Sequence, residues 1–183
     1  MEYINLNTQD IKTQALEITQ QLYGDSINWQ PDYIVGINRG GLTPAVMLSH
    51  FLNKPMYTLD IRLRDGAREP ESNIKMAFDA WEGKNILIVD DINDTGATFQ
   101  WIKKDWVSSM AGAYAPALQI ATGAREIVNW DKVWGLNVRF AVLVDNEGSE
   151  FKDVTYSALT INKTENPSWV VFPWENWWHD TNW

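Results

Sequence analysis

The stretch ILIVDDINDTGATF, residues 86–99, decides the fold of this chain. Its apolar run, Ile86–Val89, leads directly into two adjacent aspartates, Asp90 and Asp91. A short apolar run that is rich in β-branched residues is typical of a buried strand. The segment DTGAT then supplies a glycine suited to a tight turn, and residues 98–110 have the pattern of a helix. The sequence therefore predicts a strand, a turn and a helix, with an acidic pair at the carboxyl end of the strand.

The same alternation of strands and helices extends along the chain. Strands are predicted at residues 32–37, 54–63, 85–90, 138–145, 154–161 and 168–172, and helices at 8–24, 42–53 and 98–110. Thr8 and Thr43 are expected to cap the first two helices. Residues 111–137 are expected to hold another helix, broken near Gly123. Because strands that alternate with helices form βαβ units, we expect an α/β fold with a mostly parallel, twisted sheet flanked by helices.

The composition limits the classes of protein that need to be considered. A length of 183 residues, of which 45 % are hydrophobic and 21 % charged, suits a single domain, residues 1–183, with a sizeable core. The net charge of −9 argues against a nucleic-acid partner. Because the chain has no cysteine, we expect neither disulfides nor thiolate metal sites. The sequence has no apolar run of about 18 residues and no basic, apolar leader, so we expect a cytoplasmic protein without a membrane partner.

The segment DTGAT, residues 94–98, has the composition of a phosphate-binding turn. Ligands of parallel sheets bind beyond the carboxyl ends of the strands, where this segment is predicted to lie. Gly96 permits a close approach of the backbone, and the N–H groups at the start of the following helix favour an anion. Thr95 and Thr98 add hydroxyl groups. A phosphate is therefore the expected ligand of this turn.

The acidic pair beside this turn needs a partner that neutralises its charge. Asp90 and Asp91 can accept hydrogen bonds from two vicinal hydroxyl groups, and they can hold Mg²⁺ directly or through water. Together with the phosphate turn, these residues describe a sugar phosphate as the ligand. The alternative is plain capping of the following helix, which is common for an acidic strand end followed by a glycine turn.

Three segments of the chain resemble those of a known family. The full string of residues 86–99 resembles the phosphoribosyl diphosphate (PRPP) signature of the type I phosphoribosyltransferases. The segment VGINRGGLTPA, residues 35–45, resembles the pyrophosphate loop of the 6-oxopurine members, which include the xanthine–guanine and hypoxanthine–guanine enzymes. The segment NPSWVVFPWENWW, residues 166–178, is similar to the tail of the xanthine–guanine and archaeal-type purine enzymes. The resemblance covers most of the chain from residue 33 onward.

The resemblance implies the type I phosphoribosyltransferase fold and a division of the chain into a core and a hood. The core is expected at about residues 30–145, and a small hood at about residues 146–183, with a contribution from N-terminal residues. Residues 111–137 are in excess of the family pattern and are expected to form an extra helical segment.

The resemblance assigns PRPP to residues of the first two segments. These residues are Arg39, Gly40, Gly41, Asp90, Asp91, Asp94, Thr95, Gly96, Ala97 and Thr98. Asp90 and Asp91 would hold the cofactor Mg²⁺, through ribose hydroxyls or water. Arg39 would supply a forked cation for the diphosphate as a catalytic group. A cis peptide bond is implied near Asn38–Arg39.

The resemblance also assigns catalytic and base-binding residues. Asp94 is implied to handle a proton near N7 of the purine, and its alternative role is the N-cap of the next helix. Trp169 is implied to stack on the base and Val170 to bind the edge of the base through its backbone, whereas the alternative for Trp169 is a place in the core. The other tryptophans of the tail are expected to serve in packing or in a dimer surface. They are Trp174, Trp177, Trp178 and Trp183. Glu175 is expected to be a surface acid.

The chain departs from the family pattern where the base should be recognised. In the 6-oxopurine enzymes a lysine just after the fourth strand contacts the exocyclic oxygen, but here Asp145 and Asn146 stand in its place and the next lysine is Lys152. If Asp145 faces the base, its carboxylate accepts from an N–H group, and Asn146 supplies the missing donor. Hypoxanthine or guanine is then preferred over xanthine, with adenine as a competitor.

The polar segment at residues 64–73 is expected to be a lid over the site. It contains Gly66 as a hinge, and Arg62, Arg64 and Arg68 are in reach of the ligand. The alternative is an ordinary surface loop with solvated charges.

The predicted function is transfer of a 5-phosphoribosyl group between PRPP and a nucleobase, with a purine, hypoxanthine or guanine, as the expected base. The protein would then be a Mg²⁺-dependent glycosyltransferase of purine salvage that forms a homodimer or a larger homo-oligomer. Two alternatives stay open: a regulatory protein of the same fold that binds PRPP or nucleotide, and a phosphoribosyltransferase for an amino-bearing or non-purine base.

Overall fold

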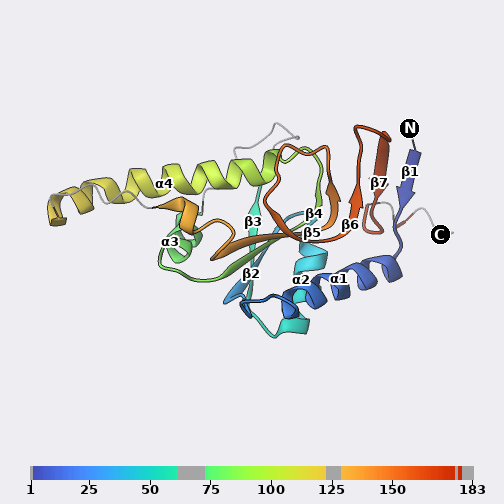
Figure 1. The fold of residues 1–183 in the computed structure, drawn as a ribbon, viewed down its shortest axis with the longest axis horizontal. Helices are drawn as coiled ribbons and strands as arrows, with labels where there is room; N and C mark the ends of the chain where they lie inside the picture. Colours follow the sequence, from blue (N-terminus) through green and yellow to red (C-terminus); the bar gives the residue numbers. More distant parts are fainter. Residues whose placement is uncertain (1, 62–72, 123–128, 176, 179–183) are drawn as a thin grey trace.

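A five-stranded parallel sheet forms the centre of the protein, as a computed structural model of residues 2–61, 73–122, 129–175, 177 and 178 shows (Figure 1). All neighbouring strands pair in parallel. In the order β3–β2–β4–β5–β6, the strands are Met56–Asp60, Tyr33–Asn38, Ile86–Asn93, Val138–Asn146 and Val154–Ile161. The α/β fold with a mostly parallel sheet that the sequence predicts is therefore confirmed.

Helices cover both faces of this sheet (Figure 1). One face carries α1 (Thr8–Tyr23) and α2 (Leu42–Leu52), and the other carries α3 (Ile74–Trp81) and α4 (Ala97–Thr122). A short 3-10 helix, Trp130–Lys132, lies between α4 and β5. In the described residues, no helix combines the length and the apolar character that a membrane span requires.

The three central strands, β2, β4 and β5, are buried on both sides, which explains why their sequences are mainly apolar instead of alternating. In β4, Ile86 and Ile88 belong to the core under α3 and α4, whereas Leu87 and Val89 belong to the core under α1 and α2. All four side chains are fully buried. This alternation brings Asp90 and Asp91 to the carboxyl end of a strand whose position is set by packing on both faces.

A second, two-stranded sheet joins distant parts of the chain. Strand β1 (Glu2–Asn5) pairs in parallel with β7 (Ser168–Val171), and Tyr3 lies opposite Trp169. Figure 1 shows this pair to one side of the five-stranded sheet, beyond β6. The division of the chain into a core and a hood stays a prediction.

Several predicted boundaries differ from the structure. Asn7, and not Thr8, caps α1, because Asn7 accepts hydrogen bonds from the backbone N–H groups of Gln9 and Asp10. The assignment of Thr43 as a cap is also wrong, since α2 begins at Leu42 with Gly41 as its N-cap and no side-chain cap.

The helix after the acidic strand is longer than predicted. Strand β4 continues through Asn93, and α4 begins at Ala97 and continues to Thr122 instead of ending at 110. Its first half is fixed by buried residues at helical spacing: Phe99, Ile102, Trp106 and Met110. Its far half extends beyond the sheet (Figure 1), and residues 123–128 lie outside the described part of the chain. Helix α3 is absent from the predicted elements.

A buried arginine ties β5 to its neighbours at the amino end of the sheet. Arg139 is 5 % exposed, and its guanidinium donates to Asp25 and to the hydroxyl of Tyr156. The guanidinium also lies 4.6 Å from the centre of the Trp29 ring. Hydrogen bonds from the backbone N–H of Ile27 and from Arg139 lower the pKa of Asp25. This cluster joins the α1–β2 connection to β5 and β6.

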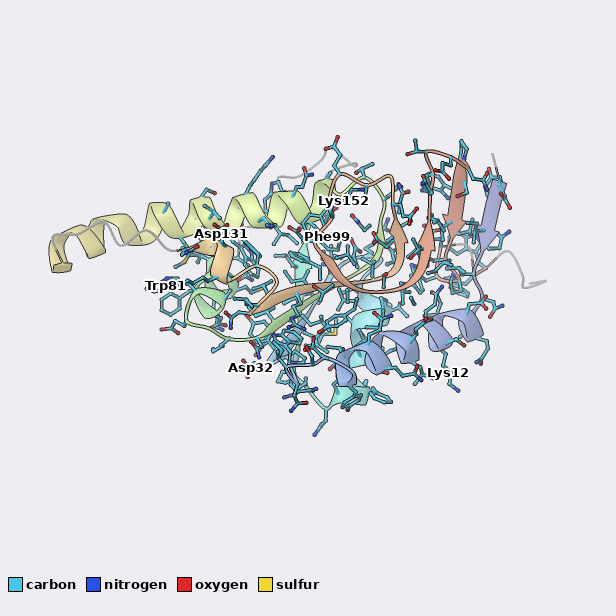
Figure 2. All side chains as sticks on the ribbon, in the orientation of Figure 1. Lys12, Asp32, Trp81, Phe99, Asp131 and Lys152 are labelled. Atoms are coloured by element: carbon cyan, nitrogen blue, oxygen red, sulfur yellow. The ribbon has the colours of Figure 1, made fainter. Side chains whose placement is uncertain are left out.

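We therefore expect the substitution Arg139→Met to destabilise the protein by about 2–4 kcal/mol, because it leaves Asp25 and Tyr156 without their shared partner. Urea unfolding followed by circular dichroism measures this loss. Lys12→Met is the matched control, since Lys12 is exposed on α1 (Figure 2) and its loss should change stability by less than about 0.5 kcal/mol. Equal stabilities of Arg139→Met and the control would show that the cluster contributes nothing.

Candidate functional site

A cavity of about 880 Å³ opens at the carboxyl ends of β2 and β4. Most of its lining comes from three segments: residues 37–40, 42 and 43 from the end of β2 to the start of α2, residues 90–99 from β4 to the start of α4, and the C-terminal residues Trp174, Glu175 and Trp178. Figure 2 labels Phe99, which lines this cavity from the first turn of α4, and Asp32, which precedes β2 at the opposite end of the sheet. The position agrees with the rule that parallel sheets bind ligands beyond the carboxyl ends of their strands.

The acidic pair lies in the wall of this cavity. The backbone N–H of Asp91 donates to the Asp90 carboxylate at 3.0 Å. Burial raises the pKa of Asp91 to about 6, and the negative charge of Glu175 adds to the rise. A carboxyl group in this environment is stabilised by any cation or hydroxyl donor that enters the cavity.

The loop after β2 lies in close contact with the acidic end of β4. A Cβ atom on Gly40 would lie 1.9 Å from a carboxylate oxygen of Asp91, and one on Gly41 would lie 2.3 Å from the carbonyl oxygen of Val89. Only glycine therefore fits at both positions. The peptide bond between Asn38 and Arg39 is cis, which confirms the bond that the sequence implies. Arg39 is exposed and lines the cavity.

The DTGAT turn forms a cradle at the start of α4. Gly96 has a φ of +86°, and a Cβ atom there would lie 2.6 Å from Phe151, so the turn requires glycine. The hydroxyl of Thr95 accepts from the backbone N–H of Ala97 at 3.4 Å. The first N–H groups of a helix have no intrahelical partner and carry a partial positive charge, which favours an anion at residues 95–98.

A second helix start faces the same cavity. Leu42 and Thr43, the first residues of α2, line it together with Arg39 and Gly40. Because Gly41 gives α2 no side-chain cap, the N–H groups of α2 are also suited to an anion. Two helix N-termini and one arginine thus surround the acidic pair, an arrangement that suits a ligand with two separate phosphate groups and a polar centre.

The predicted base-binding residues lie apart from most of this lining. Trp169 is 43 % exposed, so it is not a core residue, and Val170 beside it is buried. The side chain of Asp145 accepts from Asn93 at 2.8 Å. Asn146 is 6 % exposed, and its side-chain amide donates to the backbone carbonyl of Asp94 at 2.8 Å. The last two residues of β5 therefore use these side-chain groups to hold the segment Asn93–Asp94 in place.

Lys163 is a site residue that the sequence analysis does not single out. It lies in the connection between β6 and β7, and its ammonium is 2.8 Å from the Asp94 carboxylate. The same ammonium lies over the ring of Trp169, 5.6 Å from the ring centre. The one sequence signal was its place in the polar turn INKTEN, a few residues before Trp169, and nothing local distinguishes it from a solvated surface lysine.

The C-terminal segment contributes more to the cavity than the sequence indicates. Trp174 and Trp178 were expected as packing or dimer surface and Glu175 as a surface acid, yet all three line the cavity. Trp174 also stacks on Phe172, with ring centres 4.9 Å apart. The predicted lid residues Arg62, Arg64 and Arg68 lie outside the described part of the chain.

Comparisons with known proteins agree with this geometry. The chain is 25 % identical over 178 residues to the hypoxanthine-guanine phosphoribosyltransferase of Saccharomyces cerevisiae, a match that covers 81 % of this chain and 76 % of the yeast protein.

Two solved structures share the fold. The purine phosphoribosyltransferase of Pyrococcus horikoshii has a TM-score of 0.63 at 22 % identity, with 96 % of this chain and 95 % of that chain covered. The xanthine-guanine-hypoxanthine phosphoribosyltransferase of Helicobacter pylori has a TM-score of 0.60 at 17 % identity, with 98 % and 97 % covered. The profile of the phosphoribosyl transferase domain matches residues 5–107, which is more than half of the sequence and includes both the Arg39 loop and the acidic motif. This chain therefore belongs to the phosphoribosyl transferase domain family.

Proposed function

We propose that this protein transfers the 5-phosphoribosyl group between PRPP and a purine base, with formation of a nucleoside monophosphate and pyrophosphate. The observation that carries the proposal is the meeting of the acidic pair, the glycine cradle and the arginine loop in one cavity of about 880 Å³. The names of the relatives support a purine as the acceptor, since each of them is a purine phosphoribosyltransferase.

In the proposed complex each part of PRPP meets a segment with matching charge. The 5-phosphate binds the cradle at residues 94–98, where the N–H groups of α4 begin. The ribose hydroxyls donate to Asp90 and Asp91. The diphosphate binds the loop of Arg39, Gly40 and Gly41 at the start of α2, where the guanidinium can donate two hydrogen bonds.

The residues present fit a magnesium ion that is shared with the substrate. The described residues contain no group of three or more acidic or histidine side chains that would form a complete metal site. Mg²⁺ commonly binds through one or two carboxylates and the phosphates of a substrate, and Asp90 and Asp91 supply that number. Burial and the charge of Glu175 raise the pKa of Asp91, and a cation bound beside its carboxylate would offset both effects. When bound, Mg²⁺ would neutralise charge on the diphosphate.

The reaction breaks the bond from the anomeric carbon to the diphosphate oxygen and forms a bond from that carbon to a nitrogen of the base. The leaving diphosphate gains negative charge, which Arg39 and the N-terminus of α2 stabilise. The base loses a proton, for which the Asp94 carboxylate is the proposed acceptor near N7. Trp169 would orient the base by stacking, and the backbone of Val170 would bind its edge. These residue roles are part of the proposal.

The resemblance to the family extends the proposal to the setting of the protein. We place it in purine salvage in the cytoplasm, as a homodimer or larger homo-oligomer. Arg62, Arg64 and Arg68 would serve as a lid that excludes water from the reacting centre.

The double substitution Asp90→Asn with Asp91→Asn tests the proposed function. The amides cannot attract a cation and accept weaker hydrogen bonds from ribose hydroxyls, so kcat/KM for PRPP should fall by about 100-fold or more. Steady-state assays with PRPP, Mg²⁺ and hypoxanthine measure the loss. Asp131→Asn is the matched control, because Asp131 lies in the 3-10 helix before β5 and outside the cavity lining, and it should leave the rate unchanged. Undiminished transfer by the double variant would refute the PRPP assignment.

Asp91→Asn alone should stabilise the protein when no ligand is present. The carboxyl of Asp91 has a pKa of about 6 in the folded protein and about 4 in an unfolded chain, so its ionisation opposes folding as pH rises through this interval. The variant should therefore gain about 1–3 kcal/mol of stability at pH 8 and nothing at pH 4. Thermal unfolding in metal-free buffer at both pH values gives the comparison, and an equal effect at both would contradict it.

The stacking role predicts that Trp169→Ala raises KM for the base about tenfold or more and leaves KM for PRPP unchanged. Trp177→Ala is the control, since Trp177 is exposed and lies outside the cavity lining. A lower melting temperature of Trp169→Ala with an unchanged KM for the base would instead indicate a purely structural role.

A further inference from the structure

We propose that Lys163 determines which bases this protein accepts, by donating a hydrogen bond to an oxo group of the base. This inference rests on the proposed function, because it concerns the acceptor of the phosphoribosyl group. The observation behind it is that Lys163, from the connection between β6 and β7, joins the two groups proposed for the base, Asp94 and Trp169.

The position of the ammonium is set from two directions. It is 2.8 Å from the Asp94 carboxylate and 5.6 Å from the centre of the Trp169 ring, over whose face it lies. A base that stacks on Trp169 with its N7 edge toward Asp94 must occupy this space. The ammonium then moves from the face of the Trp169 ring to the edge of the base. There it meets the substituent on C6, which lies beside N7.

The backbone of Lys163 is held in place by Asn146, the residue that the sequence predicts as the donor to the base. Asn146 accepts from the backbone N–H of Lys163 at 3.0 Å and from that of Gly148 at 3.0 Å, while its amide donates to Asp94. The side chain of Asn146 is buried and its amide is already used. Asn146 therefore positions Lys163 and the acidic turn, and the donor to the base comes from Lys163.

Nearby lysines are engaged elsewhere. Lys103 pairs with Asp153 at 2.7 Å, and Lys152 donates to the backbone carbonyl of Glu147. Lys163 also lines a second cavity, of about 360 Å³, which adjoins the first through Asp94 and Thr95. Space is thus available beside the ammonium when it leaves the face of Trp169.

The chemistry of an ammonium group decides the selectivity. It carries three donors and no acceptor, so it pairs with the oxygen of a 6-oxopurine and leaves the 6-amino group of adenine facing another donor. A positive charge also favours an ionised base such as xanthine. The expectation from Asp145, that xanthine is disfavoured and adenine competes, is therefore replaced: hypoxanthine, guanine and xanthine should all be accepted ahead of adenine.

The test is the substitution Lys163→Met, which keeps the apolar stem and removes the charge. With PRPP and Mg²⁺ in excess, kcat/KM for hypoxanthine and for xanthine should fall roughly 10- to 100-fold, while that for adenine stays within about threefold and KM for PRPP is unchanged. Lys163→Arg should recover part of the loss. Lys152→Met, which removes a lysine outside the proposed site, should behave as wild type.

A binding measurement separates a change of selectivity from a damaged enzyme. Titration calorimetry with IMP, XMP and AMP should show weaker binding of the two oxo nucleotides to Lys163→Met and unchanged binding of AMP. An equal loss for all three nucleotides, or unchanged selectivity in a folded variant, would overturn the role of Lys163 while the transferase reaction stands. A wild-type protein that transfers phosphoribosyl to none of the four purines would refute the proposed function itself.

Discussion

The contact between the loop after β2 and the acidic end of β4 sets the geometry of the whole cavity. Gly40 touches the Asp91 carboxylate and Gly41 touches the backbone of Val89, at distances that leave no room for a side chain. This close approach places the start of α2 beside the acidic pair and keeps Asp91 largely out of water. The same contact therefore produces both the space for an anion and the raised pKa of the acid beside it.

The rest of the fold holds the two sides of that contact in register. Strands β2 and β4 are neighbours in the sheet, with Gly36 opposite Val89, and both are buried by helices on both faces. Shifting one strand by a single residue would turn its buried side chains to the wrong face, so the register is strongly specified. Arg139 secures the opposite end of the sheet, where β5 and β6 begin. The positions of the residues that line the cavity are therefore fixed by the register of the sheet below it.

The sequence was sufficient for features that are determined locally or by a long motif. The alternation of apolar runs with helical patterns predicted the parallel sheet, and strand β6 was predicted with its observed bounds, Val154–Ile161. The glycines at 40, 41 and 96 could be recognised because close backbone approach demands that residue type. Asp90 and Asp91 were placed at a strand end, and the structure brings them to the cavity wall.

The features that the sequence could not reveal depend on contacts between distant segments. Asp145 and Asn146 have the right position to meet a base, but their side chains bond to Asn93 and to the backbone of Asp94, which no local pattern indicates. Lys163 is 69 residues from Asp94 in the chain, and only the packing of the β6–β7 connection brings them together. Trp174 and Trp178 were expected in packing or a dimer surface and not in the cavity wall for the same reason, because a tryptophan in a tail has no periodic partner.

The pairing of β1 with β7 has a consequence for how the protein acquires its site. The arginine loop and the acidic motif lie within residues 37–99, so the side of the cavity that we propose for PRPP is built from segments that are close in the chain. Trp169 is held by a strand that pairs with residues 2–5, across almost the whole length of the sequence. Closing so large a loop costs chain entropy, so we expect the strand that carries Trp169 to pair with β1 only after the five-stranded sheet has formed.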